Sequence, residues 1–410
     1  MCGWGAGPRI RRSLLTVAAP SERITFVHSL RGIAALLVVI SHYLGVFWLQ
    51  PSVAAALVNS DVFEGPVPNL VVQIHRLPYL DVAHVGVALF FLISGFVIPF
   101  SLMRLGPWAF LLARMFRLWP TYLMGLAITL TAISVSGRIW GHTFPYSVSA
   151  ILSHLFFVHD LFSQPGIDGI VWTLEVEIKF YLLCALISSS IVRGSARLAV
   201  LTGILLLLCS LGIYHFRAGA TSVTNALLLD CMMLSYMLVG VIVHLCYRHA
   251  LSLKVAAAIC TALIVSFAWQ WHMTRYPGPA ESGVPNYLFA LSLFVLCLTI
   301  DKYIRPSRWL SFLAEISYPL YAVHGVMGYA VLRLLIAIGI NGYAAIVAVF
   351  GIAVVLAYIG HRLIEQPTMA FGKRLARRCT SDISARISSG GRGLGRISTS
   401  LPTVGAAVQG

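Results

Sequence analysis

Long apolar runs separated by short polar gaps follow one another along most of this chain. A helix that crosses the hydrocarbon core of a bilayer needs about 20 predominantly apolar residues. Most of the runs approach that length, so the pattern predicts about ten membrane-spanning helices. We expect these helices over residues 30–49, 82–103, 117–136, 171–192, 197–216, 226–247, 254–272, 286–301, 311–337 and 343–364.

The apolar run 147–162 is shorter than the others and carries His154, His159 and Asp160. A segment this short and this polar is a poor candidate for a complete crossing. We therefore expect it to be re-entrant or interfacial. The prediction matters for topology, because an eleventh span would move the C-terminal tail to the other side of the membrane.

Positive charge is distributed unevenly between the gaps. Every second gap is rich in Lys and Arg, whereas the gaps between them hold only isolated cations. The isolated cations are Arg76, Arg138, Arg217 and Arg275. The rich segments include 9–23, 104–117, 193–197, 248–254, 302–308 and 373–378. Because cytoplasmic loops carry the excess of Lys and Arg, this alternation places both termini in the cytoplasm.

Composition agrees with a membrane protein. Apolar residues make up 59% of the 410 residues and charged residues only 10%, whereas soluble domains carry about 25% charged residues. Lipid must therefore surround most of the chain. The net charge of +15 is spread over alternate gaps, which argues against nucleic acid as a partner. The cysteines show no metal-binding spacing, so we expect no metal.

These observations predict an all-α polytopic membrane protein in three parts. Residues 1–23 form a cytoplasmic N-terminal segment, and residues 24–378 form the membrane-embedded domain. Residues 379–410 are rich in Ser and Gly and lack an apolar period, so we expect a disordered cytoplasmic tail.

Two ionisable residues share one face of the first expected span. Eleven positions on a helix turn through about 1100°, close to three full turns, and rise about 16 Å. This separation places Arg31 at the cytoplasmic rim and His42 near the midplane. A neutral imidazole at that depth can take a proton from a hydroxyl. The alternative is that His42 only hydrogen-bonds a neighbouring helix.

A second basic pair stands at the cytoplasmic rim. Arg114 and Arg117 are three positions apart and so share a helical face. Two guanidinium groups in this arrangement suit phosphate recognition. Ordinary positive-inside anchoring explains the same two residues.

The segment 172–181 enters its span with three charged residues. Glu175 and Lys179 are spaced to pair at i, i+4, whereas Glu177 points toward Tyr181. A carboxylate here can bind a hydroxyl or orient a base. The alternative is a structural ion pair beside an aromatic belt, which explains Glu177 less well than the other two.

A polar stripe marks the ninth expected span. Ser317, Tyr321 and His324 follow one another at i, i+4 and i+7. Ser and Tyr at such positions often join helices by hydrogen bonds. His324 is a second candidate for acid–base chemistry or for contact with a bound substrate.

Six segments together resemble the acyltransferase 3 family of membrane O-acyltransferases. Each pattern alone is weak, but all six occur in the family's order over nearly all of residues 24–378. They are Ser29-Leu-Arg-Gly-Ile-Ala-Ala ending in His42, Phe90-Phe-Leu-Ile-Ser-Gly-Phe96, Arg114-Met-Phe-Arg117 with Leu-Trp-Pro-Thr-Tyr122, Trp172-Thr-Leu-Glu-Val-Glu-Ile-Lys-Phe-Tyr181, Ile316-Ser-Tyr-Pro-Leu-Tyr-Ala-Val-His324, and Arg362-Leu-Ile-Glu-Gln-Pro367. Lys179 stands where the family often has a neutral residue.

The resemblance implies an enzyme that transfers an acyl group from cytoplasmic acyl-CoA to a hydroxyl. It implies that His42 is catalytic, and that Arg31, Arg114 and Arg117 contact the CoA phosphates or the acyl carbonyl. Glu177 and His324 remain further catalytic candidates. Acetyl is the first expectation for the acyl group, with succinyl or longer chains as alternatives. Attack by the hydroxyl on the thioester and prior acylation of His42 both remain open.

The expected acceptor is a carbohydrate or a lipid-linked sugar in a bacterial inner membrane, such as a cell-surface polysaccharide or a lipopolysaccharide O-antigen. Acylation of a small secreted molecule such as a macrolide is the alternative within the same class. A proton-coupled transporter is the rival from another class, because intramembrane His, Glu and Lys residues can form a relay. Against it, the sequence shows no inverted repeat. A non-catalytic scaffold leaves His42 and the Arg pair unexplained.

Overall fold

The structure, a computed structural model, describes residues 24–74, 80–216, 221–274 and 280–390. Within these ranges every regular element is a helix and none is a strand. The predicted N-terminal segment 1–23, the cations Arg76, Arg217 and Arg275, and the part of the tail after residue 390 lie outside the described residues.

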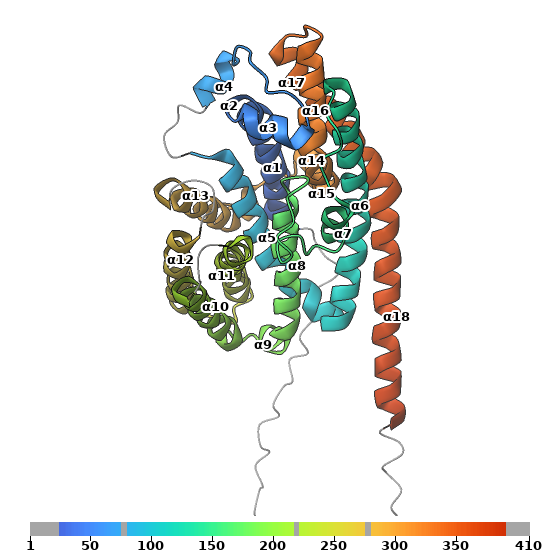
Figure 1. Cartoon of the computed structure of the whole chain (residues 1–410). Helices are drawn as coiled ribbons and strands as arrows, with labels where there is room; N and C mark the ends of the chain where they lie inside the picture. The colour runs from blue at the N-terminus through green and yellow to red at the C-terminus, as the bar shows by residue number, and fades with distance from the viewer. Residues whose placement is uncertain (1–23, 75–79, 217–220, 275–279, 391–410) are drawn as a thin grey trace, which may run out of the picture.

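The helices follow one another along the chain, and α6 and α18 run side by side (Figure 1). Their bounds are α1 Thr25–Ser41, η1 His42–Val46, α2 Phe47–Leu49, α3 Pro51–Val58, α4 Asn69–Ile74, α5 Val82–Leu105, α6 Pro107–Trp140, α7 Val148–Leu155, α8 Val171–Leu186, α9 Ser188–Val192, α10 Arg197–Phe216, α11 Ser222–Tyr247, α12 Leu253–Met273, α13 Ala280–Thr299, η2 Asp301–Tyr303, α14 Arg308–Glu315, α15 Ser317–Val323, α16 Gly325–Ala337, α17 Gly342–Gly360, η3 His361–Glu365 and α18 Gln366–Gly390.

Seven helical stretches of the described chain are long and apolar enough to cross a membrane, and the number is eight if the bent pair α15–α16 is counted as one span. The protein is therefore a multi-pass membrane protein. All ten predicted ranges overlap a helix of the structure. The stretches that qualify are fewer than ten because α8 has only 16 residues and the apolar part of α13 is also short.

Helices α5 and α11 form the most buried part of the bundle, whereas α10, α12 and α17 lie at its periphery. Two glycines allow α5 and α11 to approach closely. A Cβ atom on Gly95 would lie 2.2 Å from the carbonyl oxygen of Met237, and one on Gly240 would lie 2.6 Å from that of Leu92. Small residues at helix contacts are typical of membrane bundles, where close packing drives association. Gly95 belongs to the segment 90–96 singled out in the sequence.

The span expected over 311–337 is not one continuous helix, because the structure divides this range into α14, α15 and α16. Pro319 lies in the first turn of α15, where it cannot donate the backbone hydrogen bond that would continue α14. A second break follows at His324, where α15 and α16 meet at a bend of 57°. Gly325 begins α16 directly after this bend.

The segment 147–162 forms α7 and the start of an irregular connection that leads to α8. This connection reaches deep into the protein. Asp168 is 4% exposed, and it accepts a hydrogen bond of 3.1 Å from Tyr122, which lies near the middle of α6. Asp168 also accepts the backbone N–H groups of Ile170 and Val171, at 3.0 and 2.9 Å, and so caps the start of α8. Irregular backbone at this depth is tolerated where protein surrounds it.

Helix α18 continues the line of α17 and extends well beyond the rest of the bundle (Figure 1). It ends at Gly390, so the prediction that the tail is disordered from residue 379 is wrong for 379–390. Residues 379–389 contain neither Gly nor Pro. Nothing in this stretch stops the helix until the glycines at 390 and 391.

Candidate active site

A cavity of about 820 Å³ opens between α1, α5, α6, α8 and α15. Along α5 its lining extends from Val87 to Arg104. At 1.5 Å per residue this is about 26 Å of helix, compared with a hydrocarbon core of about 30 Å. The cavity is therefore long enough to lead from one membrane surface deep into the protein.

Four arginines surround one end of the cavity. They are Arg31, Arg104, Arg114 and Arg117. Arg104 is exposed and marks the mouth, whereas the other three are partly buried. Arg114 and Arg117 lie on the same wall, as the sequence predicts, and Arg31 faces the same cavity from α1. The cavity therefore has a strongly cationic mouth.

The partners of Arg31 and Arg114 differ. Arg114 donates to Ser101 at 3.1 Å, and its guanidinium lies over the rings of Phe110 and Tyr181 at 5.4 and 5.3 Å. Arg31 makes no hydrogen bond or ion pair with any part of the chain that the structure describes. Most of its hydrogen-bonding capacity is therefore open to a ligand in the cavity.

Arg117 also faces a carboxylate that does not line the cavity. Its Nε lies 3.9 Å from Oε1 of Glu365, which is 3% exposed. The other oxygen of Glu365 is 2.6 Å from Nδ1 of His361. Both His361 and Glu365 belong to η3, a short π-helix between α17 and α18. Such helices occur often at functional sites.

Glu177 lines the cavity and belongs to its cationic half. Its Oε1 accepts hydrogen bonds from Ser94 at 3.0 Å and from Tyr181 at 2.5 Å. Tyr181 is the ring that Arg114 covers. The structure thus joins Glu177 to the arginines and not to the histidines with which it shared the catalytic prediction.

The opposite end of the cavity has mainly apolar walls. Val87, Phe90 and Leu174 line it. A hydrogen bond of 2.6 Å between the hydroxyls of Thr173 and Tyr321 lies at this end. The ring of Tyr321 packs against Phe90 at 6.1 Å and against His324 at 5.6 Å. Tyr321 therefore separates the cavity from the residues behind it.

His42 and His324 lie together behind Tyr321. Their rings meet edge to face, with centroids 4.7 Å apart. Neither residue lines the cavity. On the other side of this pair, Phe47 packs against Trp48 at 5.1 Å and against Tyr329 at 6.2 Å. The histidine pair is thus enclosed between the end of the cavity and an aromatic cluster.

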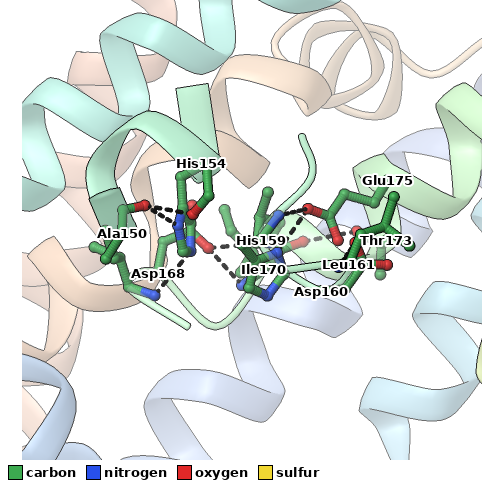
Figure 2. A network of polar contacts seen from close by, with 12 residues as sticks. Ala150, His154, His159, Asp160, Leu161, Asp168, Ile170, Thr173 and Glu175 are labelled. Carbon is green, nitrogen blue, oxygen red and sulfur yellow. Dashed lines mark hydrogen bonds and ion pairs between the residues drawn. The ribbon is translucent and has the colours of Figure 1, made fainter. Parts of the chain in front are cut away.

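The connection before α8 carries a separate polar network (Figure 2). His159 donates its backbone N–H to Glu175 at 3.2 Å, and its Nδ1 is 2.6 Å from the same oxygen. Lys179 contacts Asp160 and Asp230, each at 2.6 Å. The predicted Glu175–Lys179 pair is therefore wrong. The irregular connection brings in partners that the helical spacing could not reveal.

Opposing effects act on His159. Burial lowers the pKa of His159. The hydrogen bond to Glu175 and the negative charge of Glu175 raise it by a larger amount, so the net pKa lies above the ordinary value. Ligand atoms of His159, Asp160 and Glu175 also lie within 4.8 Å of one another, a spacing that a metal ion could use. The negative charges in this group already have partners in the chain, because Lys179 pairs with Asp160 and His159 hydrogen-bonds Glu175.

Comparison with known proteins decides the class. Residues 24–362 match the acyltransferase domain that defines the acyltransferase 3 family. The chain belongs to this family. It is also 25% identical over 322 residues to nodulation protein 10 of Rhizobium leguminosarum bv. viciae, covering 72% of this chain and 84% of that protein. No solved structure matches the chain.

The protein is therefore a membrane acyltransferase, and its family match covers most of the predicted membrane domain. The family match therefore favours the predicted enzyme over the two alternatives, a transporter and a non-catalytic scaffold. The acyltransferase also contains two partners that the sequence did not reveal. Tyr329 hydrogen-bonds Nδ1 of His42, and Glu365 faces Arg117.

The sequence carried a partial signal for one of these partners. Glu365 stands in the last of the six family-like segments. The π-helix that directs its side chain toward Arg117 could not be predicted from the sequence pattern. Tyr329 follows His324 by five positions, which on a straight helix would place the two on different faces. The 57° bend between α15 and α16 brings both to His42.

Proposed function

We propose that this acyltransferase transfers an acyl group, acetyl in the first instance, from cytoplasmic acyl-CoA to a hydroxyl of a carbohydrate. One observation carries the proposal. A cationic cavity begins at four arginines and ends one aromatic ring away from the His42–His324 pair.

The cavity suits the shape and charge of acyl-CoA. The phosphates of CoA are anionic and bind guanidinium groups well, which assigns them to Arg31, Arg114 and Arg117. The pantetheine arm is a linear chain and fits the length of the cavity along α5. The thioester then lies beside Thr173 and Tyr321, and Tyr321 must turn aside for it to reach His42. Glu177 orders Ser94 and Tyr181 around the donor.

The chemistry assigns His42 to the reacting hydroxyl. His42 takes the hydroxyl proton as the oxygen attacks the thioester carbonyl. The carbon–sulfur bond then breaks, and the thiolate of CoA takes the proton from the imidazolium. The products are an ester and CoA with a free thiol. If His42 is acylated first, the same bonds break and form in two steps. His324 supports His42 from the side in both routes.

The orientation follows from the donor. Acyl-CoA is cytoplasmic, so the arginine mouth and both termini face the cytoplasm, in agreement with the positive-inside pattern. The aromatic cluster around Phe47 then faces the opposite side, from which the acceptor approaches. In this arrangement α8 and α13 complete the ten crossings as short helices. A bacterial inner membrane provides both compartments.

A cell-surface polysaccharide, a lipopolysaccharide O-antigen or a lipid-linked sugar supplies the hydroxyl in this proposal. The second candidate is a small secreted molecule such as a macrolide, which reaches His42 from the same side.

A deletion strain tests the proposal. Its surface glycans and its secreted products are compared with those of the parent strain by mass spectrometry. We expect one acetyl ester to disappear from a glycan, to return with the wild-type gene, and to stay absent with His42→Ala. Glycans that keep every ester group in the deletion strain would contradict the carbohydrate acceptor, and a lost ester on a secreted small molecule would favour the second candidate.

A further inference from the structure

Tyr329 on α16 is the one side chain that hydrogen-bonds His42 in the described part of the chain, through Nδ1. The two rings also stack, with centroids 5.7 Å apart and an angle of 28° between their planes. Tyr329 is only 1% exposed. Its hydroxyl therefore holds a fixed position against one nitrogen of the imidazole and leaves the other nitrogen, Nε2, uncommitted.

The second histidine of the pair has a defined tautomer. Nδ1 of His324 lies 3.1 Å from the carbonyl oxygen of Leu320 and 2.9 Å from that of Tyr321. Because carbonyl oxygens only accept, Nδ1 of His324 carries the hydrogen and its Nε2 keeps a lone pair. This Nε2 is buried and has no hydrogen-bond partner in the described chain. His324 is therefore not a hydrogen-bond partner of His42, whose Nδ1 faces the hydroxyl of Tyr329.

Backbone irregularities hold the cluster together. His42 begins the π-helix η1, and the bend at His324 turns α16 toward it. Gly328 precedes Tyr329, and a Cβ atom there would lie 2.4 Å from the hydroxyl of Tyr43. That hydroxyl donates to the carbonyl oxygen of His324 at 2.7 Å. The π-helix, the bend and the close packing at Gly328 thus together bring Tyr329 into contact with His42.

We infer that Tyr329 is the positioning residue of His42, and that its oxygen accepts a hydrogen bond from Nδ1–H. This inference rests on the proposed function. The hydrogen bond fixes the tautomer in which Nε2 carries the lone pair, and only an unprotonated nitrogen can take the hydroxyl proton. When Nε2 gains that proton, Nδ1–H continues to donate to Tyr329. Nε2–H then passes its proton to the thiolate of CoA, which restores the starting tautomer.

Tyr329→Phe removes the hydroxyl and keeps the ring. Tyr236→Phe is the matched control, because Tyr236 is also fully buried and its hydroxyl donates to a backbone carbonyl, that of Tyr287, outside the cavity and the histidine pair. Membrane vesicles from the producing cell are supplied with radiolabelled acetyl-CoA, and alkali-labile label is followed. We expect the maximal rate to fall about tenfold or more in Tyr329→Phe, the effect of losing one positioned hydrogen bond. The KM for acetyl-CoA should stay unchanged, and the rate of Tyr236→Phe should stay within about twofold of wild type, because Tyr236 touches neither the cavity nor the histidine pair.

A second substitution reports the direction of the hydrogen bond and preserves the shape of the ring. Fluorotyrosines at position 329 have a more acidic hydroxyl, which accepts hydrogen bonds less well and donates them better. If Tyr329 accepts from His42, the maximal rate should fall step by step as fluorine content rises. Nitrogen NMR of labelled histidine should show Nδ1 of His42 protonated in wild type and in Tyr236→Phe, and a mixture of tautomers in Tyr329→Phe.

A wild-type maximal rate in Tyr329→Phe, or a rate that rises with fluorine content, would overturn the inference. Its failure is distinct from failure of the proposed function. If His42→Ala still transfers label, the proposed function fails. If His42→Ala is inactive and Tyr329→Phe is not impaired, only the role of Tyr329 fails.

Discussion

The cationic residues of the cavity differ in how much of their hydrogen-bonding capacity the protein itself uses. Arg31 makes no hydrogen bond or ion pair within the described chain, and Arg114 donates to Ser101 and lies over the rings of Phe110 and Tyr181. A guanidinium group has five N–H donors, so most of them remain open to a ligand. Simple anchoring at a membrane surface does not require several guanidinium groups to face one cavity, whereas phosphate binding does.

Substitution of these arginines should weaken donor binding specifically. We expect Arg114→Gln and Arg117→Gln each to raise the KM for acetyl-CoA by about tenfold to a hundredfold, the effect of losing a charge-assisted hydrogen bond. The maximal rate at saturating acetyl-CoA should change less. Arg193→Gln is the matched control, because Arg193 is exposed and lies outside the cavity. Equal KM values in all three variants would place the CoA phosphates elsewhere.

At the scale of elements, two π-helices interrupt long helices at the two ends of the candidate site. The first, η1, begins at His42, and the second, η3, ends at Glu365. Each changes the direction in which a polar side chain points into the bundle, that of His42 in η1 and that of Glu365 in η3. Glu365 in η3 faces Nε of Arg117 and leaves the remaining nitrogens of the guanidinium available to the cavity.

Glu365 should therefore act on donor binding through Arg117. We expect Glu365→Gln to raise the KM for acetyl-CoA by about two- to fivefold, because the pair is partly exposed and its N–O distance of 3.9 Å is long. The double variant Arg117→Gln/Glu365→Gln should be no worse than Arg117→Gln alone. Strictly additive effects in this double-mutant cycle would show that Glu365 acts independently of Arg117.

The connection before α8 should contribute pH-dependent stability. His159 faces Glu175, Asp160, Asp168 and His154, and its pKa is raised above its value of 6.5 in the unfolded chain. A raised pKa means that the folded state binds the proton more tightly. The stabilisation is thus complete below pH 6.5 and is lost as the pH rises through the raised pKa.

Thermal unfolding of purified protein in detergent measures this contribution. We expect the difference in Tm between wild type and His159→Asn to be largest at acidic pH and to shrink as the pH rises. His154→Asn is measured alongside, because burial and the neighbouring His159 both lower the pKa of His154. A difference in Tm that grows with pH would contradict the assigned effect of Glu175.

The sequence predicted elements better than it predicted contacts between them. The apolar runs placed a helix at every expected span, and simple helical spacing brought Arg114 and Arg117 to one wall. Spacing failed where the helix is interrupted. The bend at His324 brings Tyr329 to His42, and the irregular chain before α8 gives Glu175 and Lys179 partners other than each other. Such contacts depend on the path of a second segment, which local periodicity does not encode.

For the whole molecule, His42 lies between the cavity and an aromatic cluster. The cavity ends at Tyr321 on one side of the His42–His324 pair, and the aromatic cluster around Phe47 lies on the other side. The hydroxyl of Tyr321 is hydrogen-bonded to that of Thr173. A donor and an acceptor that enter from opposite sides therefore meet only when the closing side chains move.

Cysteine accessibility tests this sidedness. In a variant whose native cysteines are replaced, Ser94→Cys should react with a water-soluble maleimide added to the cytoplasmic side, since Ser94 lines the cavity. Added CoA should protect it. Thr143→Cys, at an exposed position between α6 and α7, should react only from the opposite side, and CoA should have no effect on it. Labelling of both positions from one side would contradict the orientation.

The central claim is that His42 transfers an acyl group supplied by CoA bound in the cationic cavity. The most direct measurement combines transfer of radiolabelled acetyl from acetyl-CoA in membrane vesicles with CoA binding to purified His42→Ala. We expect the variant to lose about a hundredfold or more of the transfer rate and to bind CoA as tightly as wild type, because His42 does not line the cavity. Transfer at the wild-type rate by His42→Ala would contradict the account.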